Sequence, residues 1–103
     1  MSKITIIILA LVIFALNGCS DKSKIEDLAE DEFSKMEQRV NQIYPDKHIE
    51  IYEKYGQMIA VVTYFDKDIG QQYAAYYYQK YNGDFTLVRW RYGHMSFLNR
   101  EGL

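Results

Sequence analysis

The apolar residues of this chain follow three different patterns, one after another. Residues 4–16 form an apolar run that only Thr5 interrupts, and from residue 25 apolar side chains recur every three or four positions. From residue 48 onward they alternate with polar residues or occur in short blocks. A period near 3.6 predicts a helix and a period of 2 predicts a strand. The sequence therefore predicts an apolar N-terminal segment, one helix and then several strands.

The helical pattern has recognisable signals at both of its ends. Ser23 and Glu26 have the spacing of a capping box, in which each side chain binds a free amide at the helix start. Pro45 disfavours helical backbone at Tyr44, so we expect the helix to end near Ile43. The apolar stripe between these limits consists of Ile25, Ala29, Phe33, Met36, Val40 and Ile43. We expect this stripe to pack on the core of the domain.

The remainder of the chain has the features of a small antiparallel sheet. Residues 48–55 alternate like a half-buried strand, and residues 58–65 are apolar on both faces, which is typical of a central strand. Gly56 and Gln57 are expected to form a turn between them. Residues 71–81 also fit a helical spacing of tyrosines, but Asn82 and Gly83 form the strongest short hairpin signal and favour two strands, the second being residues 85–92.

These elements predict an α+β fold, with one N-terminal amphipathic helix packed on an antiparallel meander of about four strands. This order is loosely similar to that of cystatin-like folds, a likeness of fold that implies no function.

The N-terminus has the features of an export signal. Lys3 precedes the apolar run, which is thirteen residues long and therefore shorter than the ~20 residues that span a bilayer. Leu16-Asn17-Gly18-Cys19 then resembles the lipobox of bacterial lipoproteins, with Asn17 in place of the usual small residue. The resemblance implies that Cys19 receives a diacylglycerol and becomes the first residue after cleavage. We therefore expect a signal peptide at 1–18, the acylated cysteine and a short tether at 19–22, and a single domain at 23–103.

The lipobox resemblance also implies a location in the cell envelope. Acyl chains contribute ~0.8 kcal/mol per buried CH₂, so two or three of them on Cys19 hold a protein on a lipid bilayer. Ser20 follows the cysteine, whereas an aspartate there resembles the inner-membrane retention signal of enteric bacteria. We expect the periplasmic face of the outer membrane in a Gram-negative host, and otherwise the outer face of the cell membrane.

Composition and motifs argue against several classes of function. A net charge of −2 without a basic cluster argues against a nucleic-acid partner. A single cysteine excludes an internal disulfide and a cysteine-built metal site. His48 and His94 lack metal-ligand spacing, and Asp66 and Asp68 lack the glycine and glutamate of a calcium loop. We expect no catalytic residue, no metal and no cofactor, and thus no enzyme.

The placement of tyrosine is the feature most informative about function, because all ten tyrosines lie between Tyr44 and Tyr92. If the isoleucines of residues 48–55 and the odd-numbered residues of 58–65 face the helix, alternation sends Tyr52 and Tyr64 to the opposite face. The expected binding face comprises Tyr52, Tyr64, Tyr76, Tyr78, Arg89, Trp90 and Tyr92. Tyrosine, tryptophan and arginine are enriched in recognition surfaces, although tyrosine is also simply a good strand former.

The sequence therefore predicts a non-enzymatic, membrane-anchored lipoprotein that presents an aromatic sheet face to a protein partner. A toxin-immunity or inhibitor protein is one version of this function. The alternative is a structural lipoprotein, or one whose rings stack on cell-wall glycan.

Overall fold

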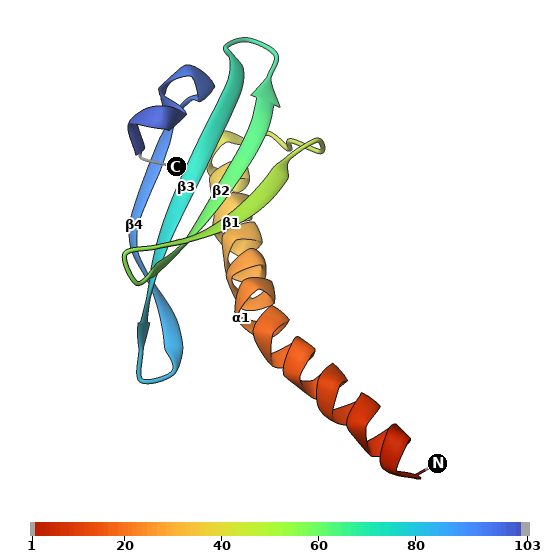
Figure 1. Ribbon diagram of the computed structural model, residues 1–103. Coiled ribbons are helices and arrows are strands. Elements are labelled where there is room, and N and C mark those ends of the chain that lie inside the picture. The colour runs from red at the N-terminus through yellow and green to blue at the C-terminus, as the bar shows by residue number, and fades with distance from the viewer. Residues whose placement is uncertain (1, 102–103) are drawn as a thin grey trace.

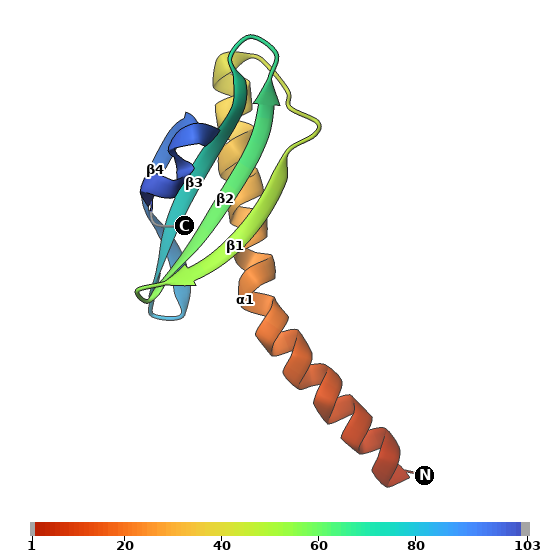
Figure 2. The same cartoon turned by 45° about the horizontal axis from the view of Figure 1, so that its top comes forward.

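A computed structural model describes the backbone of residues 2–101 and the side chains of residues 21–98. Its elements, in chain order, are α1 (Ser2–Val40), β1 (His48–Lys54), β2 (Gln57–Asp66), β3 (Gly70–Tyr81), β4 (Asp84–His94) and the 3-10 helix η1 (Met95–Glu101). The strands form one antiparallel sheet in the order β1-β2-β3-β4. The C-terminal half of α1 lies along this sheet and the N-terminal half extends beyond it (Figures 1 and 2). The predicted α+β meander is confirmed.

Helix α1 buries most of its predicted apolar stripe. Ile25, Ala29 and Phe33 are fully buried and Met36 nearly so, whereas Val40 and Ile43 are exposed. The predicted bounds are wrong at both ends. The helix begins before Ser23, at Ser2, and ends before Ile43, at Val40.

The early end of α1 follows from a C-terminal cap. Asn41 has a φ of 54°, a left-handed conformation that asparagine tolerates better than most residues. The Asn41 amide donates to the Gln38 carbonyl and the Gln42 amide to the Glu37 carbonyl, at 3.2 and 3.0 Å. These two bonds form a Schellman motif. The chain therefore leaves the helix before Ile43, and Tyr44 enters the core instead.

Two tight turns set the register of the sheet. Lys54 pairs with Gln57 and Tyr81 pairs with Asp84, so each hairpin has a two-residue turn. In both turns the two central residues have positive φ, which is the type I′ geometry that suits the twist of hairpins. The predicted turn at Asn82 and Gly83 is confirmed. The first turn is formed by Tyr55 and Gly56, one residue earlier than predicted.

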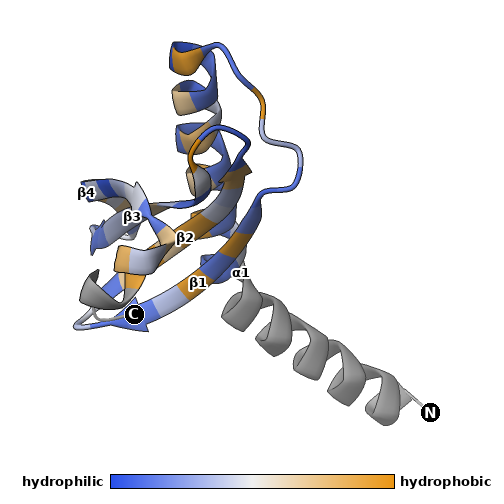
Figure 3. Cartoon of the chain, turned by 90° about the horizontal axis from the view of Figure 1, so that it is seen from above, coloured by the Kyte–Doolittle hydropathy of each residue, from blue (hydrophilic) through white to orange (hydrophobic). Residues whose placement is uncertain are grey.

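The orientation of β2 is the opposite of the one we expected. Its even-numbered residues, including Val62 and Tyr64, pack against α1, whereas Ile59 and Val61 lie on the other face. Phe65 lies on that other face as well. It pairs with Gln71, which is on the same side of β3 as Tyr73 and Ala75. Hydrophobic colouring dominates the middle of β2 in Figure 3, while β1 alternates. Both faces of the central strand are thus apolar.

The second apolar face is covered by the C-terminal segment. Ile59, Val61, Tyr73, Ala75 and Tyr77 form a second buried cluster, on which Met95 and Leu98 of η1 pack. A Cβ on Gly93 would lie 2.9 Å from the Tyr73 ring, so this crossing requires glycine. Residues 93–98, which have no clear sequence pattern, thus complete a second small core.

Candidate binding surface

The seven residues predicted to form one aromatic face do not share a face. Tyr64, Tyr76 and Tyr78 are buried beneath α1. Tyr52 pairs with Ile59 and Arg89 pairs with Tyr77, which places both of them on the opposite side of the sheet. Trp90 and Tyr92 remain on the helix-facing side and are exposed.

The buried tyrosines have structural surroundings. The ring of Tyr64 contacts those of Phe33 and Tyr44, with centroids 5.0 and 4.7 Å apart. The Tyr78 hydroxyl is buried and has no hydrogen-bond partner among the described residues. A ring buried under a helix is inaccessible to a macromolecular partner. These tyrosines therefore stabilise the core and do not form a binding surface.

Arg89 also has a structural contact. Its guanidinium carbon lies 3.9 Å from the centroid of the Tyr77 ring, a cation–π arrangement that Arg favours. Arg89 therefore covers the second core, and it does not lie on the same face as Trp90 and Tyr92.

A row of apolar side chains lies along the helix-facing side of β4, and we call it the β4 strip. Its members are Phe85, Leu87, Trp90 and Tyr92. Leu87 pairs with Tyr78 and Trp90 pairs with Tyr76, so Val88 is an extra residue in a β-bulge. The bulge changes the alternation from odd to even positions and keeps all four side chains on one side.

The β4 strip is only partly covered. Helix α1 packs mainly on β2, and on β1 and β3 beside it. Trp90 is 58% exposed and Tyr92 39% exposed, whereas Phe85 and Leu87 are half-buried. Since β4 is the last strand in the order β1-β2-β3-β4, the strip also lies at an edge of the sheet.

Side chains of α1 form the other wall beside this strip. A hollow at one end is lined by Lys24, Asp27, Leu28, Gly83, Asp84 and Phe85. At the other end, Arg39 Nη2 donates to the Tyr92 hydroxyl at 3.5 Å. The sequence pattern did not indicate that Arg39, Phe85 and Leu87 belong to this surface. The alternation at 85 and 87, followed by 90 and 92, was the signal that could have revealed Phe85 and Leu87.

Acidic residues of α1 raise the pKa of a lysine on the helix and of a tyrosine beneath it. Lys35 Nζ lies 3.4 Å from Asp31 Oδ2 and 3.5 Å from Glu32 Oε1, and these carboxylates, Glu32 first, raise the pKa of Lys35. Burial, and then the charges of Glu32 and Asp31, raise the pKa of the Tyr78 hydroxyl. Burial is also the main cause of the raised pKa of Tyr76.

The described part of the chain gives no geometry for catalysis on a metal. Among its residues, no three His, Cys, Asp or Glu side chains lie together in a way that would hold a metal ion. Nor does any helix in that part have the length and apolar character needed to cross a membrane. The side chain of Cys19, the predicted lipidation site, lies outside the described residues.

Comparisons with protein families, with curated proteins and with solved structures return no match to this chain. The function is therefore inferred from the surface itself.

Proposed function

We propose that this protein is a small, non-enzymatic lipoprotein of the cell envelope that binds a protein partner through the β4 strip. Acylated Cys19 anchors it to a bilayer. In a Gram-negative host it lies on the periplasmic face of the outer membrane. Toxin-immunity and inhibitor proteins are the versions of this function that suit so small a domain.

The observation that carries the proposal is the exposure of Trp90 and Tyr92 on a face where Tyr64, Tyr76 and Tyr78 are buried. A soluble domain gains stability by covering such rings, and α1 leaves them uncovered. Tryptophan, tyrosine and arginine are also the residue types that dominate binding energy in protein interfaces. Trp90, Tyr92 and Arg39 bring all three types together beside half-buried apolar neighbours.

The anchor is tested in the full-length chain, expressed in a bacterial host. Wild-type protein should incorporate labelled palmitate and partition into detergent, and the Cys19→Ala variant should do neither. Equal labelling of the two would rule out a lipid anchor at this residue.

The partner is tested by placing a photo-crosslinking residue at Trp90 in intact envelopes, with Phe65 as the matched control. Phe65 is an exposed aromatic residue on the opposite face of the same sheet. We expect one specific protein adduct at Trp90 and none at Phe65. With that protein purified, Trp90→Ala should weaken binding by at least about fivefold, since hot-spot truncations cost ≥ ~1 kcal/mol, and Phe65→Ala should not.

Two results would contradict this function. Equal adducts at both positions would show that the β4 strip is not a specific surface. Retention on purified peptidoglycan that Trp90→Ala abolishes, without a protein adduct, would show that the strip binds glycan instead.

A further inference from the structure

The start of the domain and the β3–β4 hairpin lie side by side. Lys80 Nζ, next to the end of β3, is 3.8 Å from Asp21 Oδ2 of α1. Asp21 follows Cys19 by two residues, and two helical residues advance the chain by only ~3 Å. A lipid on Cys19 would thus enter the bilayer close to this hairpin.

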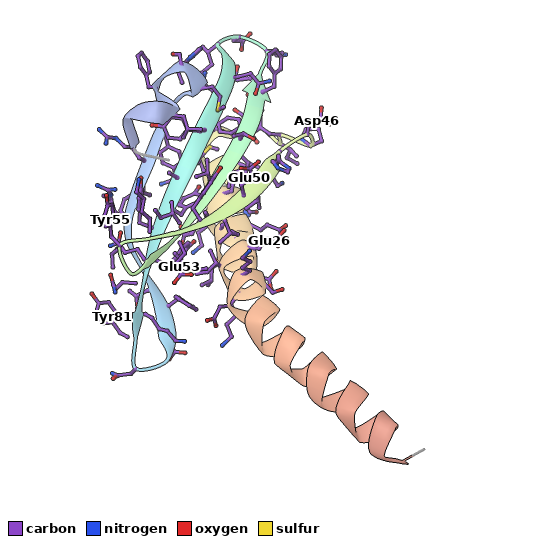
Figure 4. The ribbon with its side chains drawn as sticks, in the orientation of Figure 1. Glu26, Asp46, Glu50, Glu53, Tyr55 and Tyr81 are labelled. Atoms are coloured by element: carbon purple, nitrogen blue, oxygen red, sulfur yellow. The ribbon has the colours of Figure 1, made fainter. Side chains whose placement is uncertain are left out.

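The β1–β2 hairpin points in the same direction. In an antiparallel meander the first and third turns lie at one end of the sheet, and the second turn lies at the other. The turns at residues 55–56 and 82–83 therefore lie at the Cys19 end, and the loop at residues 67–69 lies at the far end. Figure 4 labels Tyr55 at the β1–β2 turn and Tyr81 at the end of β3, both on this side of the sheet.

Both hairpins carry an exposed aromatic ring at or next to the turn. Tyr55 is 91% exposed and Tyr81 is 56% exposed. Tyr55 also has a φ of 53°, a left-handed conformation that favours asparagine or glycine and disfavours a bulky residue. The turn itself thus gives no reason for a tyrosine at this position.

The chemistry of these turns suits a lipid headgroup layer. Tyrosine rings collect at membrane interfaces, because the ring is apolar and the hydroxyl stays hydrated. Lys54 Nζ lies 5.4 Å from the centroid of the Tyr55 ring, within reach of the phosphates around an inserted ring. Glu53 and Asp84 stand close to the same turns, so both signs of charge are present, as they are in a zwitterionic headgroup.

We propose that the two hairpin turns rest on the membrane that holds the lipid anchor, with Tyr55 and Tyr81 inserted among zwitterionic headgroups. This inference depends on the proposed acylation of Cys19. It fixes the orientation of the domain: the strands rise from the bilayer, and the 67–69 loop lies roughly 30 Å above it, the length of β2. The β4 strip is then presented sideways to a partner in the same envelope compartment.

The test measures depth in the membrane. The full-length chain is expressed, processed, purified in detergent and reconstituted into phosphatidylcholine vesicles with or without brominated acyl chains, which quench nearby tryptophan. In a Trp90→Phe background, Tyr55→Trp and Tyr81→Trp report on the two turns. Ile69→Trp, at an exposed position in the far loop, is the matched control. We expect Tyr55→Trp and Tyr81→Trp to lose a clear part of their emission in brominated vesicles, because the headgroup layer adjoins the acyl chains, and Ile69→Trp to lose none.

The outcomes separate the anchor from the membrane contact. If the wild-type chain fails to float with vesicles, the anchor is wrong and the contact that depends on it is overturned as well. If the chain floats but Tyr55→Trp and Tyr81→Trp are quenched no more than Ile69→Trp, the anchor stands and the contact is overturned. Melting temperatures of the three variants confirm that each is folded, and a variant that is not folded is replaced by a nitroxide label on a cysteine at the same position.

Discussion

The hydroxyls of Tyr76 and Tyr92 lie 3.3 Å apart. Tyr76 is buried under α1, Tyr92 belongs to the exposed β4 strip, and their rings meet edge to face with centroids 6.1 Å apart. Arg39 donates to the same Tyr92 hydroxyl. The exposed Tyr92 ring is thus oriented by two contacts, one with Tyr76 in the core and one with Arg39 on α1.

Removing the Tyr92 hydroxyl tests this connection. We expect Tyr92→Phe to lower the free energy of unfolding by about 1–3 kcal/mol, because it deprives the buried Tyr76 hydroxyl of this hydrogen bond. The double variant Tyr76→Phe/Tyr92→Phe should recover much of the loss, since neither hydroxyl then remains. Urea unfolding of the wild type, Tyr76→Phe, Tyr92→Phe and the double variant measures both effects. Additive losses in the double variant would show that the two hydroxyls do not interact.

The helical stripe makes a second prediction, about packing. Phe33 is fully buried against Tyr44 and Tyr64, so Phe33→Ala should cost about 3–5 kcal/mol. Leu28 lies on the same helix but is exposed, and Leu28→Ala should cost less than about 1 kcal/mol. Thermal unfolding compares the two variants. A similar loss for both would mean that α1 does not pack on the sheet through Phe33.

The elements of the fold were predictable from sequence because each has a strong local signal. The sequence did not predict which face of β2 packs on the helix. Both its odd-numbered and its even-numbered positions are apolar, so alternation does not distinguish the two faces. Only the core on each side decides that Val62 faces α1 and Val61 faces η1. That second core depends on Met95 and Leu98, which occur in a segment without a clear pattern.

The β-bulge in β4 explains why part of the predicted binding face was wrong. Sequence alternation assumes an unbroken strand, whereas the bulge at Val88 shifts β4 by one residue. Trp90 and Tyr92 were identified because they are aromatic, but their true neighbours on the strip, Phe85 and Leu87, lie at positions of opposite parity. Arg39 joins them only through the packing of α1.

Buried tyrosines predict a loss of stability in alkali. Burial first, and then the neighbouring Tyr44 hydroxyl, raises the pKa of Tyr64 to about 12, and burial raises those of Tyr76 and Tyr78 as well. A pKa raised in the folded state contributes stability that is complete below the unfolded value of ~10 and is lost as the pH rises through the folded value. The free energy of unfolding should therefore fall between about pH 10 and pH 12.

The measurement is urea unfolding across this pH range, with phenolate absorbance recorded in parallel. In Tyr64→Phe the decline should be shallower, because one of the contributing groups is absent. A stability that stays constant to pH 12 would mean that these hydroxyls ionise as freely in the folded chain as in the unfolded one.

The close crossing of Gly93 and Tyr73 gives a further prediction. A methyl group at residue 93 would lie 2.9–3.1 Å from the Tyr73 ring and hydroxyl, so Gly93→Ala should cost about 1–3 kcal/mol through overpacking. In a Tyr73→Val background the added methyl has room, and the same change should cost clearly less. Equal costs in the two backgrounds would show that the ring does not limit residue 93. Thermal unfolding of the four proteins gives the comparison.

The two type I′ turns allow the turn at Tyr55 to be tested against a turn in the same chain. Tyr55 and Asn82 occupy equivalent positions, with φ of 53° and 50°, and asparagine adopts this conformation at a lower cost than tyrosine. We expect Tyr55→Asn to raise the free energy of unfolding by about 1 kcal/mol and Asn82→Tyr to lower it by a similar amount. Melting temperatures of the two variants provide the measurement. If Tyr55→Asn instead lowers stability, the Tyr55 ring serves the fold, and the main reason for placing it in the membrane interface is lost.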